Sequence, residues 1–584
     1  MQQDSTLPTV ERRTLLKAAV AAGAVPVVSG LGWTFLGTLP AQAADGAPVL
    51  PGGMTPWLAQ FSNWAGDIVT DQLWTVSPTS ASQVAALATW AYRNGWRIRP
   101  RGHMHNWSPI SVAGTETSST KVLMVDTTKG MTGCSVNASA RTVTAGAGIS
   151  MEDLLTQLSN QGLGIMHHPA PGDITLGGAL AIGGHGTGIP AEGETLPAGM
   201  SAGSLPNLVL SLDAVVYDKA TDSYVVRTFR RDNPAIGALL CHVGRAFITS
   251  VTLRVGAQQY LRCQSETAIS GAELCGAPGS GWIRTIDYYL KKSGRMEMIL
   301  FPGAPLAWFK RWTVSPTKPV FSRQVTQPFN YTFADNVDSK VESNFRALTS
   351  GNYSLANTLG NVMYTAASSG LLFTGTLDIW GAAKNTMLYV KPTTLHVTAN
   401  GYAVLCRRSD VQQVISDFYQ QFKSLTANYA SRGKYPMNGP LEIRVTGVDR
   451  PSDVGIANAQ PALLSPTRSA DNRPDLDSVV WFDVLTFTGT PSAPAFYAEL
   501  EAWMLQRYTI ARNNLLRVEW SKGWGYTADG AWTSQTMLGS AVPNSFTAQQ
   551  TVGKQFKAAI AQLDALDPAR IYSAPLHERL FPKA

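Results

Sequence analysis

Twenty residues that include seven glycines, 169–188, set the strongest constraint on how this chain can fold. Glycine lets the backbone approach a ligand closely or turn through a positive φ, which residues with a Cβ rarely do. Apolar residues recur inside the stretch, at Ile174, Leu176, Leu180 and Ile182. Thr175 can cap a short helix through its side-chain oxygen. The stretch therefore predicts a buried helix between two turns that expose backbone, and the loop Gly183–Gly186 must carry positive φ angles. A glycine-rich surface loop is the alternative.

A shorter stretch, Arg101-Gly102-His103-Met104-His105-Asn106-Trp107-Ser108-Pro109, follows a strand-like segment at 96–100. A strand that runs into a glycine-containing loop leaves backbone N–H groups without internal partners, and such groups form a cradle for phosphate. Taken alone, two histidines at positions i and i+2 of a loop are more often turn or surface residues.

Together the two stretches resemble flavoproteins of the vanillyl-alcohol oxidase type. In that family the shorter stretch binds the pyrophosphate of FAD, and one of its histidines is often bonded covalently to the flavin 8α-methyl group. The pattern Arg-Gly-x-x-His-Asn-Trp places His105 at the linking position and His103 beside the cofactor. A third segment, 239–253, resembles the strand that closes the adenine side. There is no Rossmann fingerprint, so an exchanging nicotinamide is not expected.

The resemblance implies a set of FAD-contacting residues from these three segments. They are His105 (covalent), Arg101, Gly102, His103, Met104, Asn106, Pro171, Gly172, Asp173, Thr175, Leu176, Gly177, Gly178, Gly183, Gly184, His185, Gly186, Thr187 and Ile248.

Strand-like and helical patterns alternate from 80 to 256, as in an α+β or α/β domain, and the chain is too long for one core. The resemblance implies the α+β class. A capping box at Ser80–Gln83 predicts a helix that Gly95 ends, and Ser150 is expected to cap a helix through residue 158. Segments 122–125 and 141–145 predict strands. The resemblance implies two domains: an FAD-binding domain of the vanillyl-alcohol oxidase (PCMH) type and an α+β substrate domain. The expected division is 1–43, a signal peptide; 44–256, FAD binding; 257–540, substrate binding; and 541–584, a return to the FAD domain.

The N-terminus resembles a twin-arginine export signal. Arg12-Arg13 precedes a small-residue apolar run, 18–40, and Ala41-Gln42-Ala43 forms a cleavage site. Export to the periplasm or the medium is therefore expected, with an uncleaved membrane anchor as the alternative. The net charge of +7 includes no Lys/Arg block, so a nucleic-acid partner is not expected. The five cysteines include no C-x-x-C pair, so a metal site is not expected.

After residue 256 aromatic residues become frequent, and a pair of charges, Glu442-x-Arg444, lies in an apolar strand-like segment. Residues i and i+2 of a strand share a face, so the two side chains can act together on a pocket wall. A surface ion pair is the alternative. Segments 312–319, 440–444 and 518–524 resemble covalent-flavin bacterial cholesterol oxidases. Oxidising a secondary alcohol requires loss of the hydroxyl proton and of a hydride, so a carboxylate can take the proton and an arginine can hold the negative charge.

Three further residues are candidates for the site. Glu297 resembles a glutamate that moves a proton between C4 and C6 of a steroid, although a surface strand position explains it equally well. Lys522 resembles the lysine of related polyol oxidases. The chain departs from the resembled oxidases at Ala399, where they carry a glutamate, and at Asp483, where they carry an asparagine.

The sequence thus predicts an exported FAD oxidase that converts a 3β-hydroxysteroid such as cholesterol with O2 to the 3-ketosteroid and H2O2, followed by isomerisation to the 4-en-3-one. The expected partners are the sterol, O2 and, transiently, a membrane or lipid particle, with no protein partner. Two alternatives remain open: a polyol or aldonolactone oxidase, and a sterol-binding protein without flavin.

Overall fold

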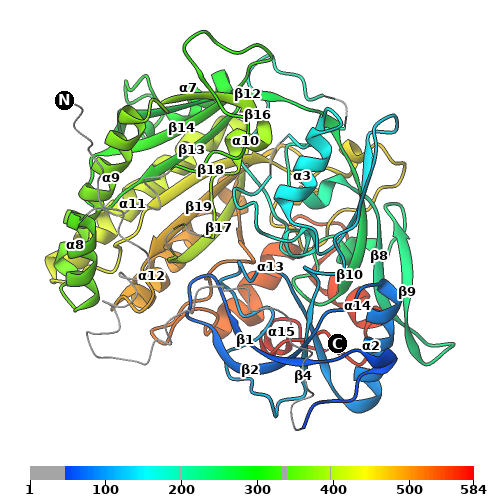
Figure 1. Cartoon of the computed structure of the whole chain (residues 1–584). Coiled ribbons are helices and arrows are strands. Elements are labelled where there is room, and N and C mark those ends of the chain that lie inside the picture. The colour runs from blue at the N-terminus through cyan, green and yellow to red at the C-terminus, as the bar shows by residue number, and fades with distance from the viewer. Residues whose placement is uncertain are drawn as a thin grey trace, which may run out of the picture.

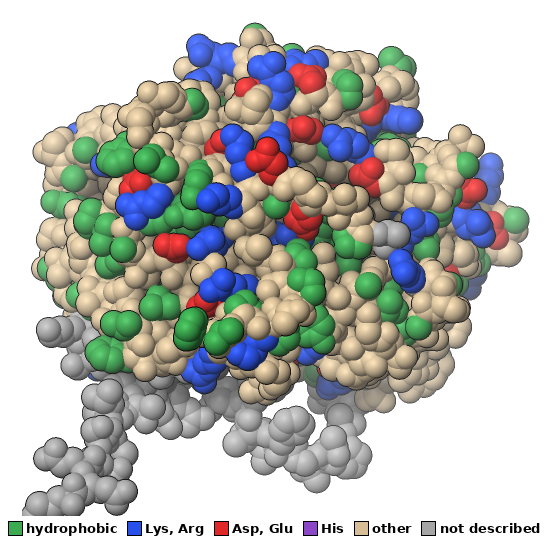
Figure 2. Space-filling model, turned by 90° about the horizontal axis from the view of Figure 1, so that it is seen from above, with side chains coloured by type: hydrophobic (Ala, Val, Ile, Leu, Met, Phe, Trp, Pro, Cys, Tyr) green, Lys and Arg blue, Asp and Glu red, His purple; other side chains and the backbone are tan. Residues whose placement is uncertain are grey.

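The computed structural model describes residues 46–166, 168–197, 199–331, 339–392, 394 and 396–583. The predicted signal peptide, 1–43, lies outside these residues. Figure 1 shows two parts: blue, cyan and red elements form one, and a large sheet coloured green to orange forms the other with its helices. On the face seen in Figure 2, charged side chains of both signs mix with small groups of hydrophobic ones. No helix of the described residues is long and apolar enough to cross a membrane.

The first part contains a four-stranded sheet of order β1-β2-β4-β3, in which β2, β4 and β3 run parallel. Its strands are β1 (Trp57–Ser62), β2 (Val69–Val76), β3 (Arg97–Arg101) and β4 (Val122–Asp126). Helix α2 (Ala81–Asn94) begins as predicted, because the Ser80 side chain accepts a hydrogen bond from the Gln83 N–H, and it ends at Gly95 with φ 68°. The strands predicted at 96–100 and 122–125 are confirmed as β3 and β4.

A five-stranded antiparallel sheet of order β5-β6-β10-β8-β9 completes this part. Its strands are β5 (Cys134–Asn137), β6 (Thr142–Gly146), β8 (Val209–Asp218), β9 (Ser223–Arg230) and β10 (Phe247–Arg254), and a short pair lies nearby, β7 (Leu163–Gly164) and β11 (Gly256–Ala257). The helices are α3 (Met151–Ser159), α4 (Leu176–Ala181) and α5 (Ile236–Leu239). Ser150 caps α3, as predicted.

The second part is built on a nine-stranded sheet of order β15-β16-β12-β14-β13-β18-β19-β17-β20, antiparallel except between β15 and β16. Its strands are β12 (Tyr260–Ser270), β13 (Arg295–Leu300), β14 (Leu306–Val314), β15 (Arg323–Gln324), β16 (Asp378–Ala382), β17 (Thr398–Cys406), β18 (Leu441–Gly447), β19 (Ser478–Thr486) and β20 (Leu515–Val518). The helices are α6 (Gly271–Leu274), α7 (Ile286–Ser293), α8 (Ser339–Thr349), α9 (Ala356–Phe373), α10 (Ala383–Met387), α11 (Val411–Ser431) and α12 (Ala493–Arg507).

Side chains alternate between the two faces of the sheet along these strands, so the apolar and the charged residues lie on opposite faces. On one face, apolar side chains such as Met298, Ile443 and Phe482 pack in the main core against α11, where Phe482 stacks on Phe418 with ring centroids 3.9 Å apart. The intervening residues on β13, β18 and β19 point to the opposite face and include most of the charged residues of the candidate site. Sheet periodicity therefore separates the apolar core from the polar site.

The C-terminal residues pack on the first part, where Figure 1 shows red helices beside the blue elements. The Ile98 N–H donates to the Ile571 carbonyl, and the Tyr572 hydroxyl donates to the Val215 carbonyl at 2.9 Å. The helices of this segment are α13 (Val542–Thr547), α14 (Phe556–Leu566) and α15 (Pro575–Leu580), and short turns elsewhere are η1 (Pro51–Gly53), η2 (Leu205–Leu208), η4 (Tyr353–Leu355), η5 (Arg408–Asp410), η6 (Pro451–Val454), η7 (Ile510–Arg512) and the π-helical η8 (Met537–Ala541).

Candidate active site

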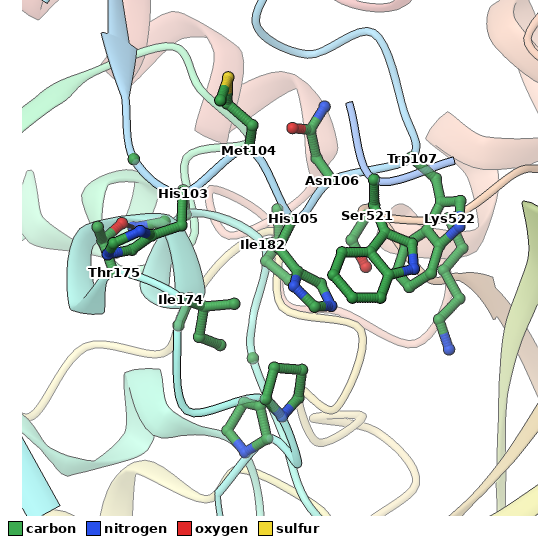
Figure 3. A pocket seen from close by; sticks show the side chains of 18 of the residues that line it. His103, Met104, His105, Asn106, Trp107, Ile174, Thr175, Ile182, Ser521 and Lys522 are labelled. Carbon is green, nitrogen blue, oxygen red and sulfur yellow. Dashed lines mark hydrogen bonds between the residues drawn. The ribbon is translucent and has the colours of Figure 1, made fainter. Parts of the chain in front are cut away.

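A cavity of about 360 Å³ lies between the two parts of the molecule. One wall comes from the loop after β3 and from the glycine-rich segment around α4, and the other from β18 and the loop after β20. Figure 3 shows the loop after β3 beside Ile174 and Thr175 on one side and beside Ser521 and Lys522 on the other. A concave site lined mainly by apolar groups, with a few convergent polar groups, is typical of a small-molecule site. The walls are far apart in sequence, so the cavity exists only in the folded chain.

The loop after β3 presents bare backbone to this cavity. The N–H groups of residues 103–106 donate to no acceptor within the described residues, and Met104 has a φ of 58°. At Gly102 a Cβ would lie 2.6 Å from the Thr175 Oγ1, so only glycine lets the loop approach α4 this closely. The loop is anchored to the opposite wall, because the Trp107 N–H donates to the Ser521 carbonyl at 2.9 Å.

His105 is the buried histidine of this loop. Its side chain is 10% exposed and stacks on Trp64, with ring centroids 3.8 Å apart. Its Nδ1 has no hydrogen-bond partner among the described residues and lies 3.9 Å from an oxygen of Asp173, which is also unpartnered. Burial and the nearby basic groups, with Lys522 among them, lower the pKa of His105 to about 3. Burial raises the pKa of Asp173. His103 is exposed and lies beside Thr175 in Figure 3.

The glycine-rich segment forms the predicted capped helix, but in the loop Gly183–Gly186, where positive φ angles were expected, only Gly183 has one. Thr175 caps α4 by accepting a hydrogen bond from the Gly178 N–H at 3.2 Å, and Gly183 has a φ of 71°. A Cβ at Gly177 would lie 2.9 Å from that of Ala147. The segment then crosses to the large sheet, where the Gly188 N–H donates to the Val445 carbonyl at 2.8 Å.

Most of the predicted FAD-contacting residues line the cavity, but four do not. Gly172 and Asp173 lie beside it, Leu176 is fully buried in the main core, and Gly183 packs near Pro466. The residues that line it are Arg101, Gly102, His103, Met104, His105, Asn106, Pro171, Thr175, Gly177, Gly178, Gly184, His185, Gly186, Thr187 and Ile248.

Arg444 is the centre of a charged cluster on the opposite wall. Strand register places Glu297 directly opposite Arg444, and Asp483 directly opposite Glu442. The Arg444 guanidinium donates to all three carboxylates, with an Nε–Oε1 distance of 2.7 Å to Glu297. Its side chain and that of Glu442 line the cavity and are 17% and 18% exposed. The two residues of the Glu442-x-Arg444 motif therefore share a pocket wall, as predicted.

Two lysines extend this cluster. Lys310, opposite Glu297 in the register, pairs with its carboxylate, and the Tyr389 hydroxyl donates to the same carboxylate at 2.6 Å. Lys522 pairs with Asp483 and lies 3.3 Å from Glu519. At Gly401 a Cβ would lie 2.7 Å from the Lys522 side chain. A glycine at this place on β17 therefore leaves room for Lys522.

The cluster contains four carboxyl groups and three cationic groups. The carboxyl groups belong to Glu297, Glu442, Asp483 and Glu519, and the cations to Lys310, Arg444 and Lys522. A net negative charge in a buried site is costly, so one carboxyl group is expected to keep its proton.

Asp483 is the carboxyl group that keeps this proton. Burial and the charge of Glu519 raise its pKa to about 7, although Lys522 and Arg444 oppose the shift. Burial alone would raise the pKa of Glu297, but Lys310 and Arg444 lower it to about 2. Burial would also raise the pKa of Glu519, but the charge of Lys522 holds this pKa well below its usual range. Below about pH 7 the cluster therefore holds two ionised glutamates beside one protonated aspartic acid.

Residues 260–582 match the protein family described as cholesterol oxidase, substrate-binding. This segment is more than half of the chain. The chain belongs to the cholesterol oxidase family. Residues 73–196 also match an FAD-binding domain family. The first match contains the whole charged cluster, and the second contains His105 and the glycine-rich segment.

Solved structures of the same family resemble the whole fold. A solvent-stable cholesterol oxidase superposes with a TM-score of 0.89 and is 47% identical, covering 92% of this chain and 100% of that chain. The cholesterol oxidase from Brevibacterium sterolicum gives a TM-score of 0.88 at 36% identity, covering 92% and 99% of the two chains.

Curated relatives match over a shorter segment. L-gulonolactone oxidases of Mus musculus and Bos taurus are 31% and 32% identical over 136 residues, which are 22% of this chain and 28% of each relative. The chain therefore matches less than a third of the length of these relatives.

Three residues of this cholesterol oxidase-family site were missed in the sequence. Lys310 could have been found, because the pattern Trp308-x-Lys310-x-Trp312 places it on one strand face with two tryptophans. Glu519 lies three residues before Lys522, and this spacing is a weaker indication that the two side chains meet. Tyr389 lies in a loop, where no periodicity predicts the direction of a side chain.

Glu297 and Asp483 are fully buried and do not line the cavity, whereas Ala399 does. Glu297 lies behind Arg444 and Tyr389, so the surface position considered for it in the sequence is excluded.

Proposed function

We propose that the chain is an FAD-dependent oxidase that converts a 3β-hydroxysteroid such as cholesterol with O2 to the 3-ketosteroid and H2O2. The observation that carries the proposal is one cavity with two different walls. A loop with unpaired N–H groups and tight glycines forms one wall, and an arginine bound to three carboxyl groups lies on the other. Family membership supports the same reading, since the substrate-binding match includes the second wall.

The residues present fit FAD. The N–H groups at 103–106, which have no acceptor among the described residues, suit a diphosphate. Gly102 and Gly177 keep the backbone closely packed around them, because a Cβ at either position would clash with Thr175 or Ala147. When bound, FAD accepts the hydride from the carbinol carbon and passes two electrons to O2. Backbone groups of the loop after β3, more than its side chains, are therefore suited to bind the diphosphate of FAD.

Glu442 is the carboxylate best placed to take the hydroxyl proton, because it lines the cavity and is partly exposed. Arg444 holds Glu442 in place and supplies positive charge where an alkoxide would develop. When Asp483 is protonated, it does not offset the positive charges of Arg444 and Lys522. The site is then more electropositive than the number of its carboxyl groups suggests.

Isomerisation to the 4-en-3-one needs a carboxylate that moves a proton across one face of the steroid. Glu297 is the sequence-based candidate, but its pKa near 2 makes it a weak base, and it does not line the cavity. Glu442 is the second candidate because it does. Glu297→Gln and Glu442→Gln should be compared by following enone absorbance and peroxide together. The residue that isomerises is the one whose loss delays the enone behind the peroxide.

Covalent attachment of FAD to His105 is part of the proposal. Attachment requires an unprotonated ring nitrogen, and the low pKa of His105 supplies one at any physiological pH. Acid precipitation should leave yellow colour in the protein pellet, and His105→Ala should release the colour into the supernatant. Colour released entirely from the wild type would contradict the link.

Export by the twin-arginine route is proposed from Arg12-Arg13, the apolar run 18–40 and the cleavage site Ala41-Gln42-Ala43. Replacing both with lysine should retain the protein in the cytoplasm, and cell fractionation measures this. Equal export of the variant would point to another route.

Aldonolactone oxidation is the second candidate, supported by the partial match to L-gulonolactone oxidases. A peroxide assay with a panel of 3β-hydroxysteroids, aldonolactones and polyols separates the two. The sterol should be oxidised fastest. A preparation with no visible absorbance would instead indicate a flavin-free sterol-binding protein.

A further inference from the structure

Four large apolar side chains extend into solvent at one edge of the nine-stranded sheet. Val320 and Phe321, in the loop before β15, are 84% and 94% exposed, and Leu372 and Phe373, at the end of α9, are 63% and 86% exposed. We call these four residues the apolar rim. Side chains of this size are rarely left so exposed in groups without a partner.

The two halves of the rim are held together by the fold. The Arg323 side chain donates to the Thr374 carbonyl at 2.6 Å, and β15 pairs with β16 immediately beyond. The Ser322 hydroxyl donates to Asp378 at 2.7 Å, which fixes the residue next to Phe321. These contacts fix the loop before β15 against the end of α9, so the two halves of the rim are held close together.

The exposed charged residues in the two segments that form the rim are basic. Lys318 and Arg323 are exposed, and the only acidic residue in segments 315–324 and 369–378 is Asp378. Arg262 neutralises Asp378 through an ion pair. An apolar tip with a basic margin complements a lipid surface with anionic headgroups.

The rim also lies on the outside of a wall of the candidate cavity. Helix α9 contains no charged residue, and its inner residues Ala367 and Leu371 pack in one apolar cluster with Trp312 and Met387. Trp312 and Met387 line the cavity. A continuous apolar layer thus connects the exposed rim with the cavity wall.

We propose that the apolar rim is the surface by which this protein docks on a sterol-containing lipid bilayer, with Lys318 and Arg323 contacting anionic headgroups. This inference rests on the proposed sterol oxidase function, because that substrate resides in bilayers. Insertion of the four side chains to headgroup depth would bring helix α9, and the apolar cluster that it shares with Trp312 and Met387, to the lipid surface. Both halves of the rim are expected to contribute.

The test uses the full protein and vesicles of phosphatidylcholine with phosphatidylglycerol and cholesterol. Leu372→Ser combined with Phe373→Ser should weaken vesicle binding about tenfold or more in a flotation assay, because apolar contact contributes most of such binding. Trp282→Ser combined with Ile283→Ser is the matched control. It removes two exposed apolar side chains just before α7, which packs on the opposite face of the sheet. The control should bind vesicles like the wild type.

A soluble 3β-hydroxysteroid in a peroxide assay separates docking from catalysis. The rim variant should turn this substrate over within about twofold of the wild-type rate, while its rate on vesicle cholesterol falls with binding. Unchanged vesicle binding by the rim variant would overturn the inference, as would an equal loss in the control. A dimer that the rim variant dissociates would assign the rim to a second copy and also overturn it. If the wild type binds vesicles but oxidises neither sterol, the proposed function fails while the docking surface stands.

Discussion

Replacing Asp483 with asparagine should remove a pH dependence that the charged cluster creates. The carboxyl group keeps its proton in the folded protein to about pH 7, against an ordinary value of 3.8. A shift of roughly 3 units corresponds to about 4 kcal/mol at 1.36 kcal/mol per unit. Because burial and the charge of Glu519 cause the shift, ionisation of Asp483 destabilises the folded protein.

The sign follows from proton binding in the two states. Between pH 4 and 7 the unfolded chain has lost this proton and the folded chain retains it, so the free energy of unfolding falls as pH rises. Asp483→Asn lacks this contribution. The stability difference between the two proteins should therefore shift by up to about 4 kcal/mol in favour of the asparagine variant between pH 4 and 8. Urea denaturation at both pH values measures it.

Activity should follow the same proton. We expect kcat/KM for one 3β-hydroxysteroid to fall about tenfold per pH unit above 7 in the wild type, as for loss of one required proton. The profile of Asp483→Asn should be flat over that range. Asp475→Asn, at an exposed position paired with Arg473, is the control and should behave as the wild type does. Superimposable profiles for wild type and Asp483→Asn would refute the reasoning.

Two further predictions concern the same cluster. Arg444→Ala should lower kcat by about 100-fold or more and should cost about 3–5 kcal/mol of stability, because three carboxyl groups lose their shared cation. Arg444→Lys should restore part of both, and full stability of the alanine variant in a melting experiment would contradict the buried network. Lys310→Met should destabilise the protein by about 3–5 kcal/mol in urea, and adding Glu297→Gln should recover most of that loss because the buried negative charge that Lys310 offsets is then removed. If the double variant were no more stable than the single one, Lys310 would be stabilising something other than Glu297.

Local sequence signals predicted the elements that local physics controls. Ser80 and Ser150 cap helices, Thr175 caps α4, and the alternation at Glu442-x-Arg444 placed both side chains on one strand face. Each of these depends on neighbours within a few residues. The partners of Arg444 were not predictable, because strand register decides them and the paired strands are up to 147 residues apart in sequence.

The same limit applies to exposure. A surface strand position was open for Glu297 in the sequence, whereas Lys310, Tyr389 and Arg444 surround its carboxylate in the fold. Phe321 is one of the aromatic residues that become frequent after residue 256, but its side chain is 94% exposed. Nothing in the sequence near it shows that β15 forms the edge of the sheet.

The most direct test of the central claim is an anaerobic titration of the purified protein with cholesterol, followed by its visible absorbance. The proposal predicts a yellow protein whose flavin absorbance bleaches with one equivalent of sterol. On admission of O2 the absorbance should return, with one equivalent of H2O2. An aldonolactone at the same concentration should leave the spectrum unchanged. A colourless protein, or a flavin bleached by the lactone and not by the sterol, would contradict the claim.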